Sequence, residues 1–493
     1  MSTIDIIIFS AYLIGIVLFG LSFYKKNKTA QAFTVGNQQI PTWVVSLSIF
    51  ATFVSSISYL GLPGQAFASN WNPFVFSLSI PIASFVAVRF FVPLYRQINS
   101  PSAYTYLEQR FGPWAKNYAA TMYLLTQLMR AATIMFLLAL LASSVVNIPI
   151  VALILITGIS VMLYSMLGGI QAVIWTDAIQ AIILIAGAIL CFLIILIDLP
   201  GGFMQVLQSG INSQKFSLGS YSFNLTNSSF WCVLIYGIFI NLQNYGIDQN
   251  YIQRYMTSSN EREAKKSAIS GSLLYIPMSL LFLLIGTSLF AFYQQNPQLL
   301  PPDLPTDRIF PHFIVNQLPI GVRGFLIASI FAAGMSTVST SINSSATVIL
   351  TDFCNMPKTK HQRNKHEMKI LYTSSFIFSL LSILIATSMI NVKSALDTWW
   401  QLASIFSGGM LGLFLLGFMS KKVKAKSAII GAIVGIIVIA WMSLSPIIFP
   451  QLGFEKFMSP FHKNMAIVFG TSAIFITGFF LTIIAKHQKK PTI

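Results

Sequence analysis

The sequence predicts an all-α membrane protein with about 13 transmembrane helices. Of its 493 residues, 55% are hydrophobic and only 9% are charged, whereas soluble proteins carry about 25% charged residues. A bilayer-spanning helix takes about 20 apolar residues, so the roughly 270 apolar positions that 55% of 493 represents suffice for about 13 spans. This composition excludes an ordinary globular enzyme and leaves little chain for a soluble domain.

Apolar stretches recur along the whole chain, and each is a predicted span. They lie at about 5–24, 41–66, 72–95, 118–146, 148–167, 171–198, 229–252, 267–293, 321–350, 370–391, 396–419, 425–447 and 464–485. No small-residue cleavage pattern follows the first stretch, so we interpret it as a retained span. The connecting segments 199–228 and 294–320 are long enough to form short helices.

The basic residues predict the orientation. The loops after spans 1, 3, 7, 9 and 11, the C-terminal tail and Arg89 hold 23 of the 30 Lys and Arg residues, with Arg254 counted in the loop after span 7. Because Lys and Arg gather in cytoplasmic loops, we expect the N-terminus outside and the C-terminus in the cytoplasm, in the plasma or bacterial inner membrane. The net charge of +17 then reflects topology and indicates no nucleic acid partner.

Two ionisable residues stand alone at membrane depth, where such groups are costly and mark functional sites by default. Arg130 either binds an anionic substrate or is a structural partner for a helix end or an acid. Asp177 either has an ion-linked role or a structural one. The five histidines lie in loops or at span ends, so no acid–base cluster is expected at depth and we do not expect an enzyme. A channel would more often repeat a filter motif, and none is visible.

Hydroxyl groups are concentrated in the ninth predicted span. Eight of the ten residues at 336–345 are polar. Serine and threonine in membrane helices often bond to the carbonyl four residues back or join helices, which explains one or two hydroxyls but not eight. Ala333, Ser336, Thr337 and Thr340 share one helix face, and a line of neutral oxygens suits a small hard cation such as Na⁺.

Two predicted spans carry interruptions. Span 2 has a serine-rich stretch at 51–60 that runs directly into Gly61-Leu62-Pro63-Gly64, and span 7 has a polar run at 241–246. Irregular backbone at membrane depth is tolerated around a cavity, and paired interruptions in two halves indicate a transporter binding site. We therefore predict two inverted repeats, 41–198 and 229–419, preceded by a first span (5–24) and followed by two last spans (425–485).

Four segments resemble the sodium:solute symporter family. They are 50–58, 164–177, 249–254 and 331–340, and the likeness extends over about residues 5–420. The resemblance implies a LeuT-type core of five plus five inverted helices, with one extra N-terminal and two extra C-terminal helices, in a single transmembrane domain that acts as a monomer.

The resemblance also implies two sodium sites. Site one would use the carbonyls of Ala51, Val54 and Ala333 with the hydroxyls of Ser336 and Thr337. Site two would use Asp177 with Ser336, Ser339 and Thr340. A carboxylate there would offset the hydration that a buried cation loses.

Within the family, the chain most resembles the bacterial sialic acid (N-acetylneuraminate) symporters. Arg130 would grip the substrate carboxylate, because a guanidinium binds a carboxylate with two parallel hydrogen bonds. The remaining substrate-binding candidates are Ser55, Ser56, Ser58, Ser77, Asn241, Gln243 and Asn244. Ser77 stands where the resemblance leads us to expect glutamine. The alternatives are a sodium symporter for another small organic acid or for a neutral sugar.

Overall fold

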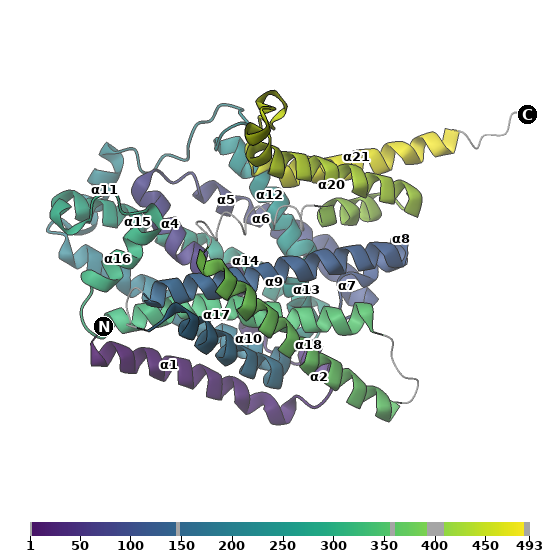
Figure 1. Ribbon diagram of the computed structural model, residues 1–493, viewed down its shortest axis with the longest axis horizontal. Helices are drawn as coiled ribbons and strands as arrows, with labels where there is room; N and C mark the ends of the chain where they lie inside the picture. The colour runs from purple at the N-terminus through teal and green to yellow at the C-terminus, as the bar shows by residue number, and fades with distance from the viewer. Residues whose placement is uncertain (1, 144–147, 355–359, 392–408, 488–493) are drawn as a thin grey trace, which may run out of the picture.

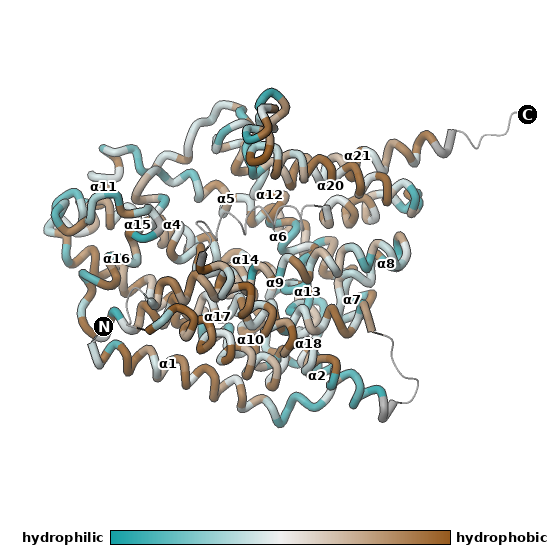
Figure 2. The backbone as a smooth tube through the Cα atoms, viewed as in Figure 1, coloured by the Kyte–Doolittle hydropathy of each residue, from teal (hydrophilic) through white to brown (hydrophobic). Residues whose placement is uncertain are grey.

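The computed structural model describes residues 2–143, 148–354, 360–391 and 409–487, and these ranges contain helices but no strand. Within these ranges, ten helices are long and apolar enough to cross a membrane, and one bent pair adds an eleventh candidate span. The long helices lie side by side in one bundle (Figure 1). Figure 2 shows apolar residues along the long helices and polar residues at many of their ends and in the connections. Leu18 and Ile197 are 61% and 80% exposed, as expected of side chains that face lipid.

The elements follow the predicted order. The first half contains α1 (Thr3–Leu21), η1 (Ser22–Lys26), α2 (Ala30–Val35), η2 (Gly36–Gln38), α3 (Thr42–Phe53), α4 (Ser56–Ala68), α5 (Phe74–Leu78), α6 (Ile80–Val86), η3 (Ala87–Phe91), α7 (Val92–Ile98), α8 (Thr105–Phe111), α9 (Pro113–Ser143) and α10 (Ile150–Asp198). The second half contains α11 (Gly202–Asn212), α12 (Phe230–Ile247), α13 (Gln249–Thr257), α14 (Glu261–Leu273), α15 (Tyr275–Gln295), η4 (Pro297–Leu299), η5 (Thr306–Arg308), α16 (Ile309–Asn316), α17 (Val322–Val348), η6 (Ile349–Phe353), α18 (Lys360–Ser388), η7 (Met389–Asn391), α20 (Ala425–Ile448), η8 (Pro450–Leu452), η9 (Glu455–Phe457) and α21 (Met465–His487). Short helices do form in both long connections, as expected.

The long helix α10 contains two of the predicted spans. Its 49 residues would extend about 74 Å at 1.5 Å per residue, more than twice the roughly 30 Å of bilayer hydrocarbon. Gly169 interrupts it with φ +61° and ψ −160°, a conformation that side chains with a Cβ rarely adopt. The break falls between the predicted spans 148–167 and 171–198. Of the eleventh predicted span, 396–419, the structure describes only the part from 409 on. The total of 13 is compatible with these findings.

The second predicted span is broken, but not at the glycines. Helices α3 and α4 meet at 58°, and the two residues between them, Val54 and Ser55, are extended. The segment 61–64 lies inside α4, Pro63 included. Gly64 serves close packing instead. A Cβ on Gly64 would clash with the carbonyl oxygen of Thr306.

The seventh predicted span is broken as well, and its break lies after the polar run. Residues 241–246 are helical and belong to α12, which ends at Ile247. Asp248 is extended, and its carboxylate accepts a hydrogen bond from the backbone N–H of Asn250 (2.8 Å), so it caps the N-terminus of α13. A capping carboxylate satisfies free N–H groups and the helix dipole. The break therefore follows the polar run and does not lie within it.

Candidate functional site

The hydroxyl-rich helix α17 lies at the centre of the bundle. Every residue at 326–348 is buried, and the helix packs against α1, α3, α9, α10, α13 and α18. Some of its hydroxyls have ordinary partners. The Thr337 hydroxyl donates to the carbonyl of Ala333 (3.2 Å) and that of Ser339 to the carbonyl of Ser336 (3.0 Å). These polar groups are thus held at fixed positions along one helix.

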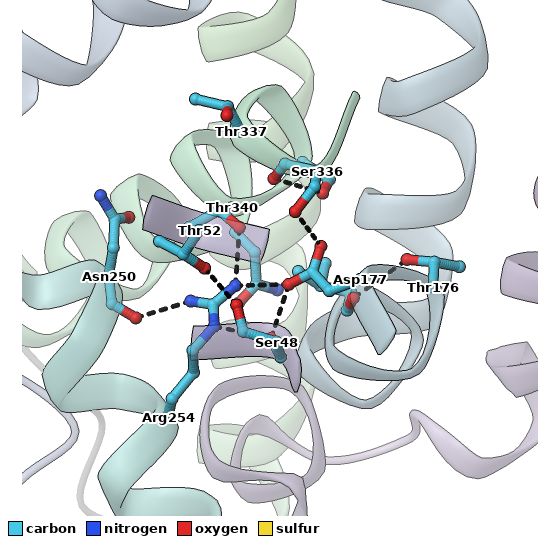
Figure 3. A network of polar contacts seen from close by, with 12 residues as sticks. Ser48, Thr52, Thr176, Asp177, Asn250, Arg254, Ser336, Thr337 and Thr340 are labelled. Carbon is cyan, nitrogen blue, oxygen red and sulfur yellow. Dashed lines mark hydrogen bonds and ion pairs between the residues drawn. The ribbon is translucent and has the colours of Figure 1, made fainter. Parts of the chain in front are cut away.

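An ion pair lies beside this helix. Arg254 Nη2 donates to Asp177 Oδ2 at 2.7 Å, and both side chains are 0% exposed. Asp177 lies on α10 and Arg254 on α13, and Figure 3 shows the two side chains converging between their helices. A buried charge without a partner is very unfavourable. The pair keeps this part of the interior electrically neutral.

Hydroxyls from two more helices complete the network around the pair (Figure 3). Ser48 on α3 donates to Asp177 Oδ2 (2.6 Å) and accepts from Arg254 Nε (2.7 Å). Ser336 donates to Asp177 Oδ1 (2.6 Å), while Thr340 accepts from Arg254 Nη2 (2.6 Å). Arg254 Nη1 donates to the carbonyl of Asn250 (2.6 Å). Four separate elements, α3, α10, α13 and α17, therefore meet at one carboxylate.

Three of the four residues predicted for sodium site two are in this network. Asp177, Ser336 and Thr340 are linked directly, and Ser339 joins through the carbonyl of Ser336. The guanidinium among them was not expected from the sequence. Arg254 was wrongly expected in a cytoplasmic loop, because the short segment that carries it is rich in polar residues. The signal was the family-like segment 249–254, which ends on this arginine.

Helix α13 is polar in sequence but buried on every side. All nine of its residues are buried. Gln249 accepts from the N–H of Ala103 (2.8 Å) and donates to the carbonyl of Pro101 (2.6 Å). Gln253 Nε2 contacts the carbonyl of Thr34, the amide oxygen of Asn343 and the hydroxyl of Thr347 at 2.7–3.0 Å. These partners lie far away in sequence, so only the tertiary structure provides them.

The residues predicted for sodium site one lie on α3, at the break after it and on α17, and these two helices pack against each other. Ala51 and Val54 are buried at the end of α3 and at the break, and Ala333 is buried on α17. Ser336 was assigned to both sites. A hydroxyl has one proton to donate and two lone pairs, so Ser336 can donate to Asp177 and still present oxygen to a cation.

Arg130 lies next to the break between α3 and α4. Its Nη2 donates to the carbonyl of Thr52 at 3.2 Å, one of the last carbonyls of α3, which have no partner within the helix. Among the described residues, Thr52 is the hydrogen-bond partner of Arg130. Arg130 is partly exposed. This hydrogen bond is the one expected of a structural partner for a helix end. It leaves other N–H groups of the Arg130 guanidinium available to bind an anion.

The serine hydroxyls at and after the break between α3 and α4 differ in burial and in hydrogen bonding. Ser55 is 8% exposed and caps α4 by position but makes no capping bond. Ser56 is buried, and its hydroxyl has no hydrogen-bond partner among the described residues. Ser58 is partly exposed. A buried hydroxyl without a partner is costly, so Ser56 is a candidate to bond with something the structure does not hold.

The substrate-binding candidates on α5 and α12 differ in burial and in hydrogen bonding. Ser77 is buried. Asn241 Nδ2 donates to the hydroxyl of Ser79 (2.9 Å), two residues after Ser77 in the chain. The amide oxygens of Asn241 and Gln243 are buried without a partner within the described ranges. Asn244 is partly exposed.

A model of the sodium:solute symporter family matches residues 33–435. The chain is 32% identical to the sodium/sialic acid symporter NanT of Aliivibrio fischeri, over 89% of this chain and 88% of that protein. It is 33% identical to the sodium/sialic acid symporter SiaT of Proteus mirabilis, over 87% of each. A solved Na⁺-coupled sialic acid symporter, substrate-bound and outward-open, is 30% identical, with a TM-score of 0.89 over 98% of both chains.

Proposed function

The chain belongs to the sodium:solute symporter family, and we propose that it is a sodium-coupled symporter for sialic acid. One observation carries the choice of substrate. The backbone follows that of a Na⁺-coupled sialic acid symporter over 98% of both chains. The position of Arg130 supports it, because a guanidinium beside a helix break suits the one carboxylate of sialic acid. The protein acts as a transporter and not as an enzyme.

The proposed mechanism is alternating access. Na⁺, as cargo, would bridge the end of α3 and the hydroxyls of α17, using Ala51, Val54, Ala333, Ser336 and Thr337. This would hold the broken helix in the shape that binds substrate. The carboxylate would dock on Arg130, and hydroxyls of the substrate on Ser55, Ser56, Ser58, Ser77, Asn241, Gln243 and Asn244. The free hydroxyl of Ser56 supports the choice of this surface.

We propose two Na⁺ ions per cycle, the second held by Asp177, Ser336, Ser339 and Thr340. Arg254 already neutralises Asp177, so a second ion would share the carboxylate with the guanidinium. We therefore expect the second ion to bind more weakly than the first. Ser336, which touches Asp177 and belongs to site one as well, would couple the two ions.

The proposed orientation places the N-terminus outside and the C-terminus in the cytoplasm, as the Lys and Arg bias indicates. All proposed cargo ligands come from one chain, which supports a monomer as the transporting unit. Cysteines introduced at exposed Ser222 and Lys422 test the orientation. A membrane-impermeant maleimide should label the first but not the second in intact cells. The reverse labelling would contradict the proposal.

A ligand screen on purified protein tests the function. Sialic acid in Na⁺ buffer should raise the thermal unfolding midpoint, whereas proline, glucose and pantothenate should not, and K⁺ should not replace Na⁺. Arg130→Ala should abolish the sialic acid shift, and Arg130→Lys should retain little of it, because an ammonium lacks the planar fork. Arg262→Gln, at an exposed position, is the matched control. Stabilisation by another compound and not by sialic acid would refute the substrate.

A further inference from the structure

A hollow outside the transport site gathers lysines at one end of the bundle. It is an open surface hollow of about 590 Å³ between the segment after η1 and the first turns of α18. Its lining includes Lys28, Lys365, Lys369, Asn364, Met368 and Tyr372. We refer to it as the lysine hollow. Helices α2 and α18 contact each other beside it, and Figure 1 shows α2 next to α18 near its N-terminal end.

Hydrogen bonds fix the walls of the lysine hollow. Asn364 Nδ2 donates to the carbonyl of Lys28 (3.3 Å), and the Tyr372 hydroxyl contacts the carbonyl of Asn27 (3.5 Å). Asn27 Nδ2 in turn donates to the carbonyl of Leu167 on α10 (2.9 Å). Three elements are thereby tied together. The lysines stand on a frame that is already formed and does not need to be ordered by a ligand.

The positive charge of the hollow is not balanced. Lys28, Lys365 and Lys369 are exposed, and none is in an ion pair within the described ranges. The nearest acid along α18, Glu367, is paired with Arg363 (2.7 Å). Like charges that share a site repel one another. An anion that binds all three lysines would relieve this repulsion.

The hollow lies where polar and lipid-facing surfaces meet. Beyond Tyr372, α18 carries apolar side chains that point outward, with Phe376 and Ile377 47% and 49% exposed. Figure 2 shows this change from polar to apolar along α18. Met368 and Tyr372 add apolar surface within the hollow itself. A ligand that fits carries a phosphate for the lysines and acyl chains for the helix surface.

We propose that the lysine hollow binds an anionic phospholipid through its headgroup phosphate. Basic pockets between transmembrane helices bind such headgroups, and each lysine near an anionic surface strengthens binding about fivefold. The proposal goes beyond transport and does not depend on which substrate is carried. A bound lipid would clamp the segment after α1 to α18.

The test compares phosphatidylglycerol, phosphatidylcholine and inorganic phosphate as additives to purified protein in detergent. Bound lipids are counted by native mass spectrometry, and the thermal unfolding midpoint is measured in parallel. The test variant is Lys28→Gln/Lys365→Gln/Lys369→Gln. The matched control is Lys421→Gln/Lys422→Gln/Lys424→Gln, which removes three other exposed lysines. A third variant, with arginine at 28, 365 and 369, keeps the charge.

Phosphatidylglycerol should bind and stabilise the original protein, the control and the arginine variant. The glutamine test variant should bind it about a hundredfold more weakly. Phosphatidylcholine and inorganic phosphate should have no comparable effect. Equal binding by the test variant would overturn the proposal, as would an equal loss in the control. Stabilisation by inorganic phosphate alone would show an anion site and not a lipid site.

Discussion

The Asp177 carboxylate accepts hydrogen bonds from Ser48, Ser336 and Arg254 in a fully buried position. From the sequence we expected this carboxylate to offset the hydration that a buried cation loses. The structure shows instead that its charge is already balanced by a guanidinium. A sodium ion that binds here must compete with or share the bonds of Arg254, so this arginine is a candidate determinant of how tightly the second ion is held.

Replacing only one residue of the Asp177–Arg254 ion pair should lower the free energy of unfolding far more than replacing both. Arg254→Gln leaves Asp177 buried without a counter-charge, and such changes cost about 3–5 kcal/mol. Asp177→Asn/Arg254→Gln should cost clearly less, since no charge remains. The free energy of unfolding in detergent without Na⁺ measures both. Lys265→Gln, which breaks an exposed pair with Glu261, should cost below about 1 kcal/mol. Equal losses for Arg254→Gln and Lys265→Gln would argue against this account.

At the scale of elements, both helix breaks lie next to polar side chains that form hydrogen bonds with the backbone groups at the helix ends. Arg130 donates to a carbonyl at the end of α3, and Asp248 caps α13. Gly64 of α4 has a different role, which is to allow the close approach of η5. A Cβ on Gly64 would clash with Thr306, whereas one on Gly61 would meet nothing within 4 Å.

The two glycines of α4 provide a matched pair of substitutions. Gly64→Ala should destabilise the protein by about 1–3 kcal/mol through overpacking against η5. Gly61→Ala should be neutral or stabilising by up to about 1 kcal/mol, because alanine favours helix over glycine. The thermal unfolding midpoints of the two variants decide the matter. A midpoint for Gly64→Ala at or above that of Gly61→Ala would contradict the packing role.

For the whole molecule, ion number determines how membrane potential drives uptake. Two Na⁺ with one monovalent anion move one net positive charge inward. A potential of 100 mV then contributes about 2.3 kcal/mol, or about fiftyfold in accumulation. Proteoliposomes clamped with K⁺ and valinomycin should show uptake that increases with an inside-negative potential.

The double variant Asp177→Asn/Arg254→Gln separates one ion from two. It keeps the interior neutral but removes the carboxylate of site two, so its transport should become electroneutral and lose its dependence on potential. The Hill coefficient for Na⁺ should fall toward 1. A double variant that still responds to potential as the original protein does would exclude Asp177 as a ligand of the second ion.

Much of the architecture could be predicted from the sequence, since in a membrane the apolar stretches must be helices about 20 residues long. Their order, the two broken spans and the placement of Arg130 and Asp177 within long apolar helices all followed from local composition. The isolation expected for Asp177 was wrong, because Arg254 pairs with it. The break positions were misplaced by several residues, because proline and glycine that permit a break can also serve close packing. The assignment of site residues came from resemblance and stays a prediction.

The sequence by itself determined the helical membrane fold, because burial in lipid constrains every apolar stretch locally. Only the tertiary structure decided what the charges do. Arg254 looks like a loop cation along the chain, and its partner Asp177 lies 77 residues away. Helix α13 is rich in polar residues, and inside the bundle α2, α17 and the segment at 101–103 provide hydrogen-bond partners for Gln249 and Gln253. Pairing of polar groups across a bundle depends on which helices meet, and no local pattern records that.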